Sequence, residues 1–263
     1  MQNTQDMIQR LNLSGSRLSK SHRRIAEYIL QHYDKAVFMT AAKLGEMVNV
    51  SESTVVRFAV ALGYEGYPEL QQALQELVRH RLTATQRFEM SSDISQEEVL
   101  STVLKADMQN IRSTIDGIDN AAFLRAVQVI SGARRIYILG LRSAAPLAQF
   151  AGYYLHYIFD DMRVVAAGST DVFEAISRIE ASDVLLGISF PRYSSRTIEA
   201  MSFARSRHAQ VIGLTDGPMS PLHEVADICL SMRTDMASFV DSMAAPMSVI
   251  NALIAAQRSN IEM

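Results

Sequence analysis

Apolar and polar positions alternate with a helical period in the first part of the chain. Residues 40–62 show the pattern most clearly and predict two short helices joined by a tight turn. The positions that form one face of each helix are Leu44, Met47 and Val48, then Val55, Phe58, Ala59 and Leu62. Thr40 and Ser51 precede the helices and can cap them, because a hydroxyl accepts a hydrogen bond from a free backbone N–H. Asn49 tolerates the left-handed conformation of such a turn, and Gly45 allows the helices to cross closely.

The same spacing predicts helices on both sides of this pair. One begins after a capping serine, Ser19 or Ser21, and another begins at Pro68 after Gly63 ends the preceding helix. Residues 83–95 are polar and lack periodicity, so we assign them to a linker. Ser95 and Glu98 then have the spacing of a capping box. The apolar stripe of the helix that follows comprises Leu100, Leu104, Met108, Ile111 and Ile115.

Farther along, the pattern changes to short apolar runs rich in β-branched residues, which are typical of buried strands. These runs are RRIYILGL, MRVVAA (162–167), DVLLGIS (183–189), AQVIGLT (209–215) and DICLSM (227–232). Helical patterns lie between most of the runs and after the last one, at 144–159, 171–179, 197–207 and 239–258. Strands and helices that alternate in this way predict a parallel sheet with helices on both faces.

These patterns predict an all-α helix-turn-helix domain at 1–82, the linker at 83–95 and an α/β domain at 96–263. The length of 263 residues is sufficient for two domains. The single cysteine, Cys229, excludes an internal disulfide framework. The N-terminus lacks the apolar segment of a signal peptide, and no run approaches the ~18 apolar residues of a membrane span. We therefore expect a cytoplasmic protein without a membrane segment.

The net charge of −3 does not by itself suggest a nucleic-acid-binding protein. It is distributed unevenly, however. Residues 1–85 carry ten Lys and Arg against eight Asp and Glu, a net of +2, and the rest carry 15 against 20, a net of −5. The sign of this asymmetry favours DNA contact by the N-terminal part.

The second helix of the 40–62 pair has the features of a recognition helix. Ser53 and Arg57 point away from its apolar face, where an Arg can bind guanine and valine methyl groups can contact thymine. The residues that we expect to contact DNA are Lys43, Ser51, Ser53, Thr54 and Arg57. A helical hairpin in an ordinary all-α domain, with Arg57 merely solvated, is the alternative.

Two loops of the α/β part have the composition of an anion site. One is Gly140–Ser143, after the first predicted strand, and the other is Ser189–Thr197, after the third. Hydroxyls and free N–H groups at the start of a helix bind phosphate well. We expect Ser195 to cap the helix that begins there, and the cluster as a whole to bind an anion.

Several of these stretches resemble known families. LGEMVNVSESTVVRFAVALGYEGYPEL is similar to the helix-turn-helix domain of the RpiR family of bacterial transcription regulators. YILGLRSAAPLA, ISFPRYSSRTIEAM and VIGLTDGPMSPLHEVADI are similar to recurrent stretches of the SIS, or sugar isomerase, domain. The second resemblance implies that a phosphosugar is gripped by the Ser/Thr loops, here by Ser143, Ser189, Ser194 and Thr197.

The favoured hypothesis is a non-enzymatic transcription regulator in which a sugar phosphate, bound by the SIS domain, modulates binding to a double-stranded DNA operator. We expect it to be a homodimer or homotetramer and to need no cofactor or metal. One alternative is a phosphosugar isomerase or lyase with an accessory helix-turn-helix domain, and another makes the N-terminal helices an oligomerisation module. An isomerase needs a base; the conceivable ones are Glu174, Glu199, His223 and Asp241. The sequence does not identify the effector or the operator, or distinguish a repressor from an activator.

Overall fold

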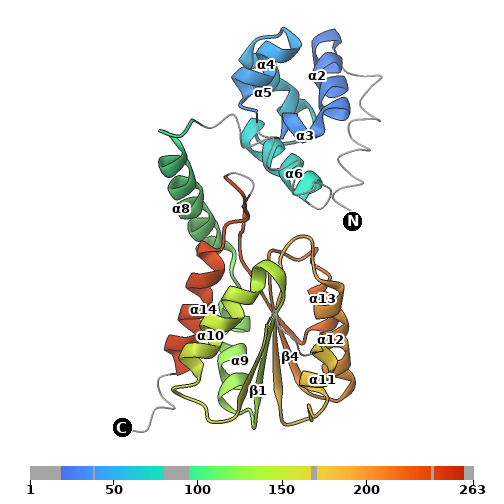
Figure 1. The fold of residues 1–263 in the computed structure, drawn as a ribbon. Helices are drawn as coiled ribbons and strands as arrows, with labels where there is room; N and C mark the ends of the chain where they lie inside the picture. The colour runs from blue at the N-terminus through green and yellow to red at the C-terminus, as the bar shows by residue number, and fades with distance from the viewer. Residues whose placement is uncertain (1–18, 38, 80–94, 167–170, 238–239, 258–263) are drawn as a thin grey trace. The chain divides into compact units, whose positions relative to one another are not determined.

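The computed structural model describes residues 19–37, 39–79, 95–166, 171–237 and 240–257 (Figure 1). The chain divides into two compact units, Met1–Gln96 and Glu97–Met263, and each is described by itself. Most of the predicted linker lies outside the described residues. None of the helices in the described ranges is both long enough and apolar enough to cross a bilayer.

The described part of the first unit is entirely helical, as predicted. Its helices are α2 (Lys20–Gln31), α3 (Tyr33–Ala36), α4 (Ala41–Val48), α5 (Glu52–Ala61) and α6 (Tyr67–Arg79). Ser19, and not Ser21, caps α2 by accepting a hydrogen bond from the His22 N–H. The apolar faces of these helices form one core around Ile25, Leu44 and Phe58, all of them fully buried. Met47 was expected in that core but is 50% exposed.

Helices α4 and α5 form the predicted helix-turn-helix. Thr40 and Ser51 cap them by accepting hydrogen bonds from Lys43 N and Thr54 N. Asn49 has the expected left-handed conformation, with φ 54°. A Cβ on Gly45 would lie 2.8 Å from the Val50 carbonyl oxygen, so the predicted close crossing is confirmed.

Side chains from α2 and α6 hold the helix-turn-helix in place. Arg24 donates a hydrogen bond to the carbonyl of Val48, one of the carbonyls that the end of α4 leaves free. The Tyr67 hydroxyl donates to the carbonyl of Met39 at 2.6 Å, and the Gln71 amide donates to the same oxygen at 3.0 Å. Burial raises the pKa of Tyr67 to about 12, so this hydroxyl stays a donor.

The second unit contains a five-stranded sheet. Its strands are β1 (Ile136–Gly140), β2 (Met162–Val165), β3 (Val184–Ile188), β4 (Gln210–Thr215) and β5 (Ile228–Ser231). All neighbouring strands pair in parallel, in the order β2-β1-β3-β4-β5. Its helical elements are α8 (Val99–Gly117), α9 (Asn120–Ser131), η3 (Arg142–Ala144), α10 (Ala145–Leu155), α11 (Val172–Ile176), α12 (Ser195–Ser206), α13 (Leu222–Val225) and α14 (Ala244–Ala256).

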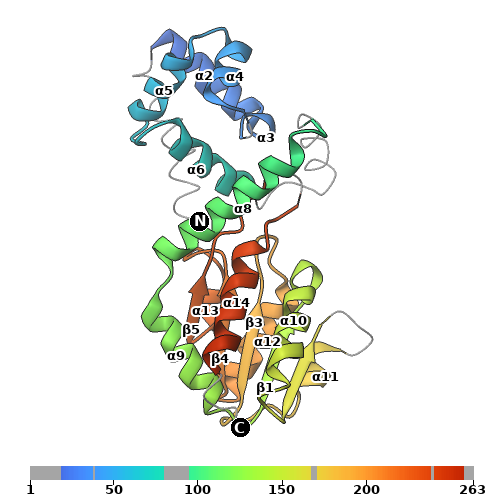
Figure 2. The same ribbon diagram turned by 90° about the vertical axis from the view of Figure 1, so that its left-hand side faces the viewer.

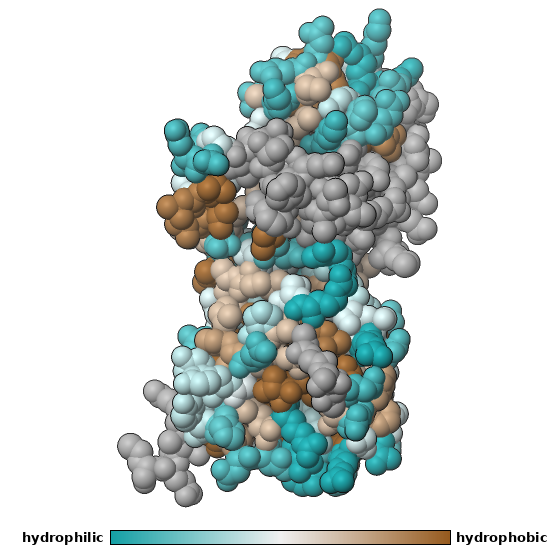
Figure 3. All heavy atoms as spheres, viewed as in Figure 1, coloured by the Kyte–Doolittle hydropathy of each residue, from teal (hydrophilic) through white to brown (hydrophobic). Residues whose placement is uncertain are grey.

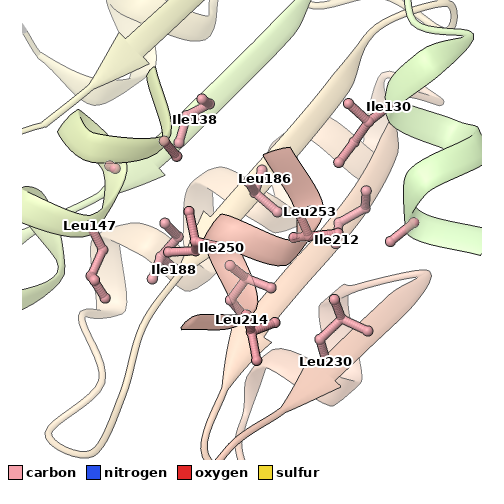
Figure 4. Packing of buried hydrophobic residues seen from close by; sticks show 14 of the residues in the cluster. Ile130, Ile138, Leu147, Leu186, Ile188, Ile212, Leu214, Leu230, Ile250 and Leu253 are labelled. Atoms are coloured by element: carbon pink, nitrogen blue, oxygen red, sulfur yellow. The ribbon is translucent and has the colours of Figure 1, made fainter. Parts of the chain in front are cut away.

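Helices cover both faces of the sheet, which confirms the predicted fold class (Figures 1 and 2). Successive strand side chains point to opposite faces. Thus Ile136 and Ile138 of β1 pack with α9, α10 and α14, whereas Tyr137 and Leu139 pack with α11, α12 and α13. Figure 4 shows the first of these cores, in which Leu186, Ile250 and other aliphatic side chains meet.

Helix α8 buries polar residues and exposes apolar ones, the reverse of a usual surface helix. Its buried residues are the polar Asn110 and Thr114, whereas the predicted apolar stripe lies largely on its exposed side. Asn110 hydrogen-bonds the backbone of Asp235 in both directions, at 2.8 and 3.0 Å. The Thr114 hydroxyl accepts from Arg233 N at 2.9 Å. These bonds fasten α8 to the segment that joins β5 to α14.

Several predicted helix boundaries were wrong. Helix α8 begins at Val99 after a turn, without a side-chain capping hydrogen bond, so the Ser95–Glu98 box does not cap it. Helix α14 begins at Ala244 rather than at 239; Asp241 and Ser242, which precede it, bond instead to Arg192 and to Asp107 of α8. Helices α10 and α11 are shorter than the patterns suggested, and position 258 lies outside the described residues.

Candidate functional site

Helix α5 presents a polar outer side near its start. Ser53, Val56, Arg57 and Val60 are exposed, while Val55, Phe58 and Ala59 are buried on the other side. The Ser51 Oγ lies 3.0 Å from the Ser53 Oγ and 2.8 Å from the Thr54 Oγ1. The Arg57 Nη2 lies 3.5 Å from the Thr54 Oγ1. The structure therefore brings four of the five predicted DNA-contact residues together at one end of this helix.

The fifth predicted residue, Lys43, lies on the preceding helix, α4. It is exposed, and its Nζ is 3.3 Å from the Glu46 carboxylate on the same helix. Exposed pairs of this kind contribute little to stability, about 0–1 kcal/mol. Lys43 can therefore exchange Glu46 for a phosphate at little cost.

His22 of α2 packs against α5. Its ring meets the Phe58 ring edge-on, with a centroid distance of 5.6 Å. Burial, and then the positive charge of Arg57, lower the pKa of His22 below its ordinary value. His22 is therefore less readily protonated than an ordinary histidine and adds little positive charge to this surface at pH 7.

The two predicted anion loops lie next to each other at the carboxyl end of the sheet. Gly140 and Ile188 are paired residues at the ends of β1 and β3, so the loops after them start side by side. This is also where the strand order reverses, the position at which open parallel α/β sheets bind ligands. The Arg142 Nη1 donates to the carbonyl of Arg192 at 3.4 Å and so joins the loops directly.

The predicted hydroxyls of the second loop face inward. The Ser189 Oγ accepts from Ser194 N at 3.2 Å, and the Ser194 Oγ accepts from Thr197 N at 3.3 Å. Ser194, rather than the predicted Ser195, is therefore the N-cap of α12. Thr197 is fully buried, and its hydroxyl has no hydrogen-bond partner among the described residues. Of the four predicted ligand residues, only Ser143, on the first loop, is exposed.

Both loops contain an arginine in the left-handed conformation, Arg142 with φ 58° and Arg192 with φ 68°. Non-glycine residues adopt such angles at a cost of about 1–3 kcal/mol, and they cluster at functional sites. The Arg192 Nη2 lies 3.1 Å from the buried Asp241 Oδ2, while its Nε is buried without a described partner. The sequence had placed Arg192 in an anion loop but gave no indication of its pairing with Asp241.

A third loop, after β4, contributes a further polar network that the sequence did not suggest. The Tyr193 hydroxyl is 2.7 Å from the Asp216 Oδ1. The Thr215 Oγ1 is 3.2 Å from the same oxygen and 2.6 Å from the buried Ser220 Oγ. These bonds fix the second loop against the third.

Catalytic groups are sparse at this end of the sheet. Among the four conceivable bases, Glu174, Glu199 and His223 are exposed helix residues, and only Asp241 has a recorded contact with the loops. Burial raises the pKa of the half-buried Cys229 to about 11, which keeps the thiol from acting as a nucleophile. Within the described ranges, no three His, Cys, Asp or Glu residues are grouped so that they could hold a metal ion.

A helix-turn-helix with an exposed polar recognition side, followed by a parallel α/β domain with polar loops at its switch point, defines a class of two-domain DNA-binding protein. Comparison with known families agrees. The helix-turn-helix domain of the rpiR family matches residues 5–80, and the SIS domain matches residues 129–256. The chain belongs to the RpiR family of helix-turn-helix transcriptional regulators and carries a SIS domain.

Two similar proteins are named as transcriptional regulators. The HTH-type transcriptional regulator HexR of Escherichia coli (strain K12) is 27% identical, over 94% of this chain and 86% of the relative. The HexR protein of Pseudomonas aeruginosa is 28% identical, over 86% of this chain and 79% of the relative.

Solved structures with the same fold include a domain of a transcription factor and a protein solved with a bound ligand. The sugar isomerase domain of an RpiR transcription factor from Sphaerobacter thermophilus has a TM-score of 0.58 and 25% identity, and the match covers 60% of this chain and 88% of that one. The Vibrio vulnificus NanR protein, complexed with ManNAc-6P, has a TM-score of 0.56 and 21% identity, and the match covers 96% and 92% of the two chains.

Proposed function

We propose that this transcriptional regulator reads an operator with helix α5 and senses a sugar phosphate with the loops after β1 and β3. The observation that carries the first part is the division of α5 into a buried apolar side and an exposed side bearing Ser53, Val56 and Arg57. Arg57 is placed to donate to guanine in a major groove, and Val56 and Val60 to contact thymine methyl groups. Ser51, Thr54 and Lys43 are suited to phosphate oxygens.

The effector assignment is supported by the position and chemistry of the two loops. They lie at the switch point of the sheet, and the second leads into the N-terminus of the 12-residue helix α12, whose dipole favours an anion. The orphan hydroxyl of Thr197 is consistent with a ligand oxygen as its partner, because a buried unsatisfied hydroxyl costs about 1–3 kcal/mol. The NanR protein, which has the same fold, was solved with a phosphosugar.

A route from these loops toward the linker is supported by the contacts of Asp241 and its neighbours. Asp241 pairs with Arg192 of the second loop. The adjacent Ser242 donates a hydrogen bond to the Asp107 carboxylate of α8 at 2.6 Å, and α8 follows the linker in the chain. A phosphate that drew Arg192 away from Asp241 would therefore act on α8. Such coupling requires that the effector bind one arrangement more tightly than another.

The test is a gel-shift titration with Arg57→Ala and the DNA upstream of the protein's own gene. Loss of one bidentate base contact costs about 1–3 kcal/mol, or roughly 5–150-fold in specific affinity. Binding of a sugar phosphate, measured by calorimetry, should be unaffected. If the variant bound the operator as tightly as the unmodified chain, α5 would not be the recognition helix.

The enzymatic alternative is tested on the same preparation. Asp241 is the one conceivable base with a recorded contact to the effector loops. Turnover of an aldose or ketose phosphate that disappears in Asp241→Asn would establish an isomerase. We expect binding without turnover.

A further inference from the structure

The start of helix α2 carries a concentration of positive charge that the fold of the first unit does not require. Lys20, Arg23 and Arg24 fall within five positions, and His22 lies among them. The first turn of α2 contains no acidic residue. The positive end of a helix dipole lies at its N-terminus, so cations placed there destabilise a helix. This arrangement of charge is therefore unfavourable in the isolated protein and becomes favourable when an anionic partner covers it.

Two contacts place the start of α2 beside the helix-turn-helix. The ring of His22 meets that of Phe58 on α5 at a centroid distance of 5.6 Å. The charge of Arg57 also reaches His22, whose pKa is lowered first by burial and then by that charge. Arg24 donates a hydrogen bond to the carbonyl of Val48, the last residue of α4. These contacts fix the start of α2 against the end of α4 and the middle of α5.

Lys20 and Arg23 are not used by the fold in the way that Arg24 is. Both side chains are exposed. Among the residues that the structure describes, neither side chain has an ion pair or a hydrogen bond, although Glu27 lies one helical turn beyond Arg23. Figure 3 shows hydrophilic side chains, in teal, over the described helices of the first unit. Two cations without counter-ions thus lie next to the helix that we assign to DNA recognition.

We propose that Lys20 and Arg23 bind the sugar-phosphate backbone of double-stranded DNA, on a strand that flanks the groove entered by α5. Lys and Arg are common donors to phosphate oxygens, and such contacts set the position of a protein on the duplex without reading its sequence. In this division of roles, Arg57 contacts bases and the start of α2 fixes the domain on the backbone. The inference rests on the proposed function, because it assumes that α5 enters a groove.

The test is the salt dependence of DNA binding by the full chain. Fluorescence anisotropy would measure affinity for a duplex from upstream of the protein's own gene and for a random duplex of equal length, at several salt concentrations. The logarithm of affinity falls linearly with the logarithm of salt concentration, by about 0.9 for each phosphate neutralised. Lys20→Gln and Arg23→Gln should each flatten this slope by about 0.9 for every copy of the chain in the complex. Each should also weaken binding to both duplexes by the same factor.

Lys35→Gln is the matched control. Lys35 is an exposed lysine on α3, which follows the opposite end of α2. The 12 residues of α2 span about 18 Å, so Lys35 is far from the proposed contact. Its substitution removes the same charge from the same unit and should leave the salt slope unchanged.

Thermal stability supplies a second measurement that separates lost binding from misfolding. Removal of Lys20 takes a cation away from the positive end of the α2 dipole. Lys20→Gln should therefore unfold at the same temperature as the unmodified chain or at a higher one, while its affinity for DNA falls. Weaker DNA binding accompanied by a lower unfolding temperature in both α2 variants would assign the loss to misfolding and overturn the proposal.

Failure of this inference can be distinguished from failure of the proposed function. Arg57→Ala should weaken binding to the upstream duplex more than binding to the random one, whereas the α2 variants should weaken both alike. If Arg57→Ala lowers specificity while both α2 variants keep the original salt slope, α5 reads DNA and α2 does not contact it. If Lys35→Gln flattens the slope as much as Lys20→Gln, the effect is one of net charge and the proposed contact is wrong. A chain that binds neither duplex would overturn both proposals.

Discussion

The side chains assigned to DNA on α5 point into solvent, whereas most of those assigned to the effector face into the protein. Ser53 and Arg57 are exposed, and their recorded contacts are with neighbours on the same helix. Ser189 and Thr197 are buried, and the Ser189 hydroxyl is bonded to the backbone of its own loop. On the proposed assignments, α5 would bind DNA without rearrangement, whereas the effector loops would exchange internal bonds for bonds to the ligand.

This difference explains how a small anion could change the protein. A ligand shifts a conformational equilibrium only through contacts that differ between two states. Contacts that already exist within the second loop, and between Arg192 and Asp241, are bonds that a phosphate could replace. Such replacement is not available on α5, so we expect regulation to begin in the SIS domain.

The substitution with the largest expected effect should abolish operator binding and leave effector binding intact. In Gly45→Val the new Cβ would lie 2.8 Å from the Val50 carbonyl oxygen, so α4 and α5 cannot cross as they do. Overpacking of this kind costs typically about 1–3 kcal/mol and occasionally more. We expect gel shifts to find no specific operator binding, while calorimetry finds normal effector binding. Ala42→Val, at an exposed position on the same helix, should bind normally; equal losses in both variants would contradict the explanation.

The next effect concerns the ion pair that joins the second loop to the segment before α14. In Asp241→Asn, Arg192 loses its buried counter-ion. Arg192 is 31% exposed, so we expect a cost of about 1 kcal/mol, below the range for fully buried pairs. The freed guanidinium should bind the effector more tightly, and the effector should change operator affinity less.

Calorimetry and effector-dependent gel shifts measure the two results. Asp171→Asn is the matched control, because Asp171 pairs at 3.3 Å with Arg196, an exposed arginine at the start of α12. A variant at Asp241 that kept full effector response would remove this pair from the proposed route.

A more local effect, confined to the proposed effector site, tests the orphan hydroxyl of Thr197. Thr197→Val keeps the shape of the side chain and removes a hydroxyl without a described partner, so thermal stability should be unchanged or slightly higher. If the hydroxyl bonds the effector phosphate, affinity should fall about 10–100-fold, as for a hydrogen bond to a charged group worth about 1.5–3 kcal/mol. Ser189→Ala, by contrast, should lower both stability and affinity, because Ser189 supports its own loop. Unchanged effector affinity in Thr197→Val would exclude Thr197 from the site.

The smallest expected effect is electrostatic and concerns the pKa of His22, whose ring packs against Phe58 of α5. His22 should titrate below pH 6.5 in an NMR experiment, because burial and Arg57 both lower its pKa. In Arg57→Ala the titration midpoint of His22 should move part of the way back toward 6.5. Since the unfolded chain binds this proton more readily, His22 makes the first unit less stable as pH falls below about 6.5. A midpoint that Arg57→Ala leaves unchanged would show that the charge of Arg57 does not act on this ring.

Local patterns were sufficient to predict both folds and the caps and turn of the α4–α5 pair. Asn49, Gly45 and the caps Thr40 and Ser51 each act within a few residues of sequence, so their roles follow from spacing and side-chain chemistry. The position of the two anion loops could also be predicted, because parallel strands end at one edge of the sheet.

Long-range pairing could not be predicted. The Arg192–Asp241 contact joins residues 49 positions apart, and nothing in either local sequence specifies it. The same holds for α8, whose stripe of Leu100 to Ile115 would ordinarily indicate a core-facing side. Its polar residues are buried because Asn110 and Thr114 find backbone partners on a segment more than 100 positions later.

Cys229 has a practical consequence for experiments that follow movement of the effector loops. It is the single cysteine of the chain, and its half-buried thiol, with a pKa of about 11, is almost wholly protonated at neutral pH. Maleimide dyes react with the thiolate, so an exposed cysteine introduced on α12 would be labelled much faster than the native one. A fluorescent reporter could therefore be placed beside the effector loops without first removing Cys229, and its emission would report loop movement in the otherwise unmodified chain.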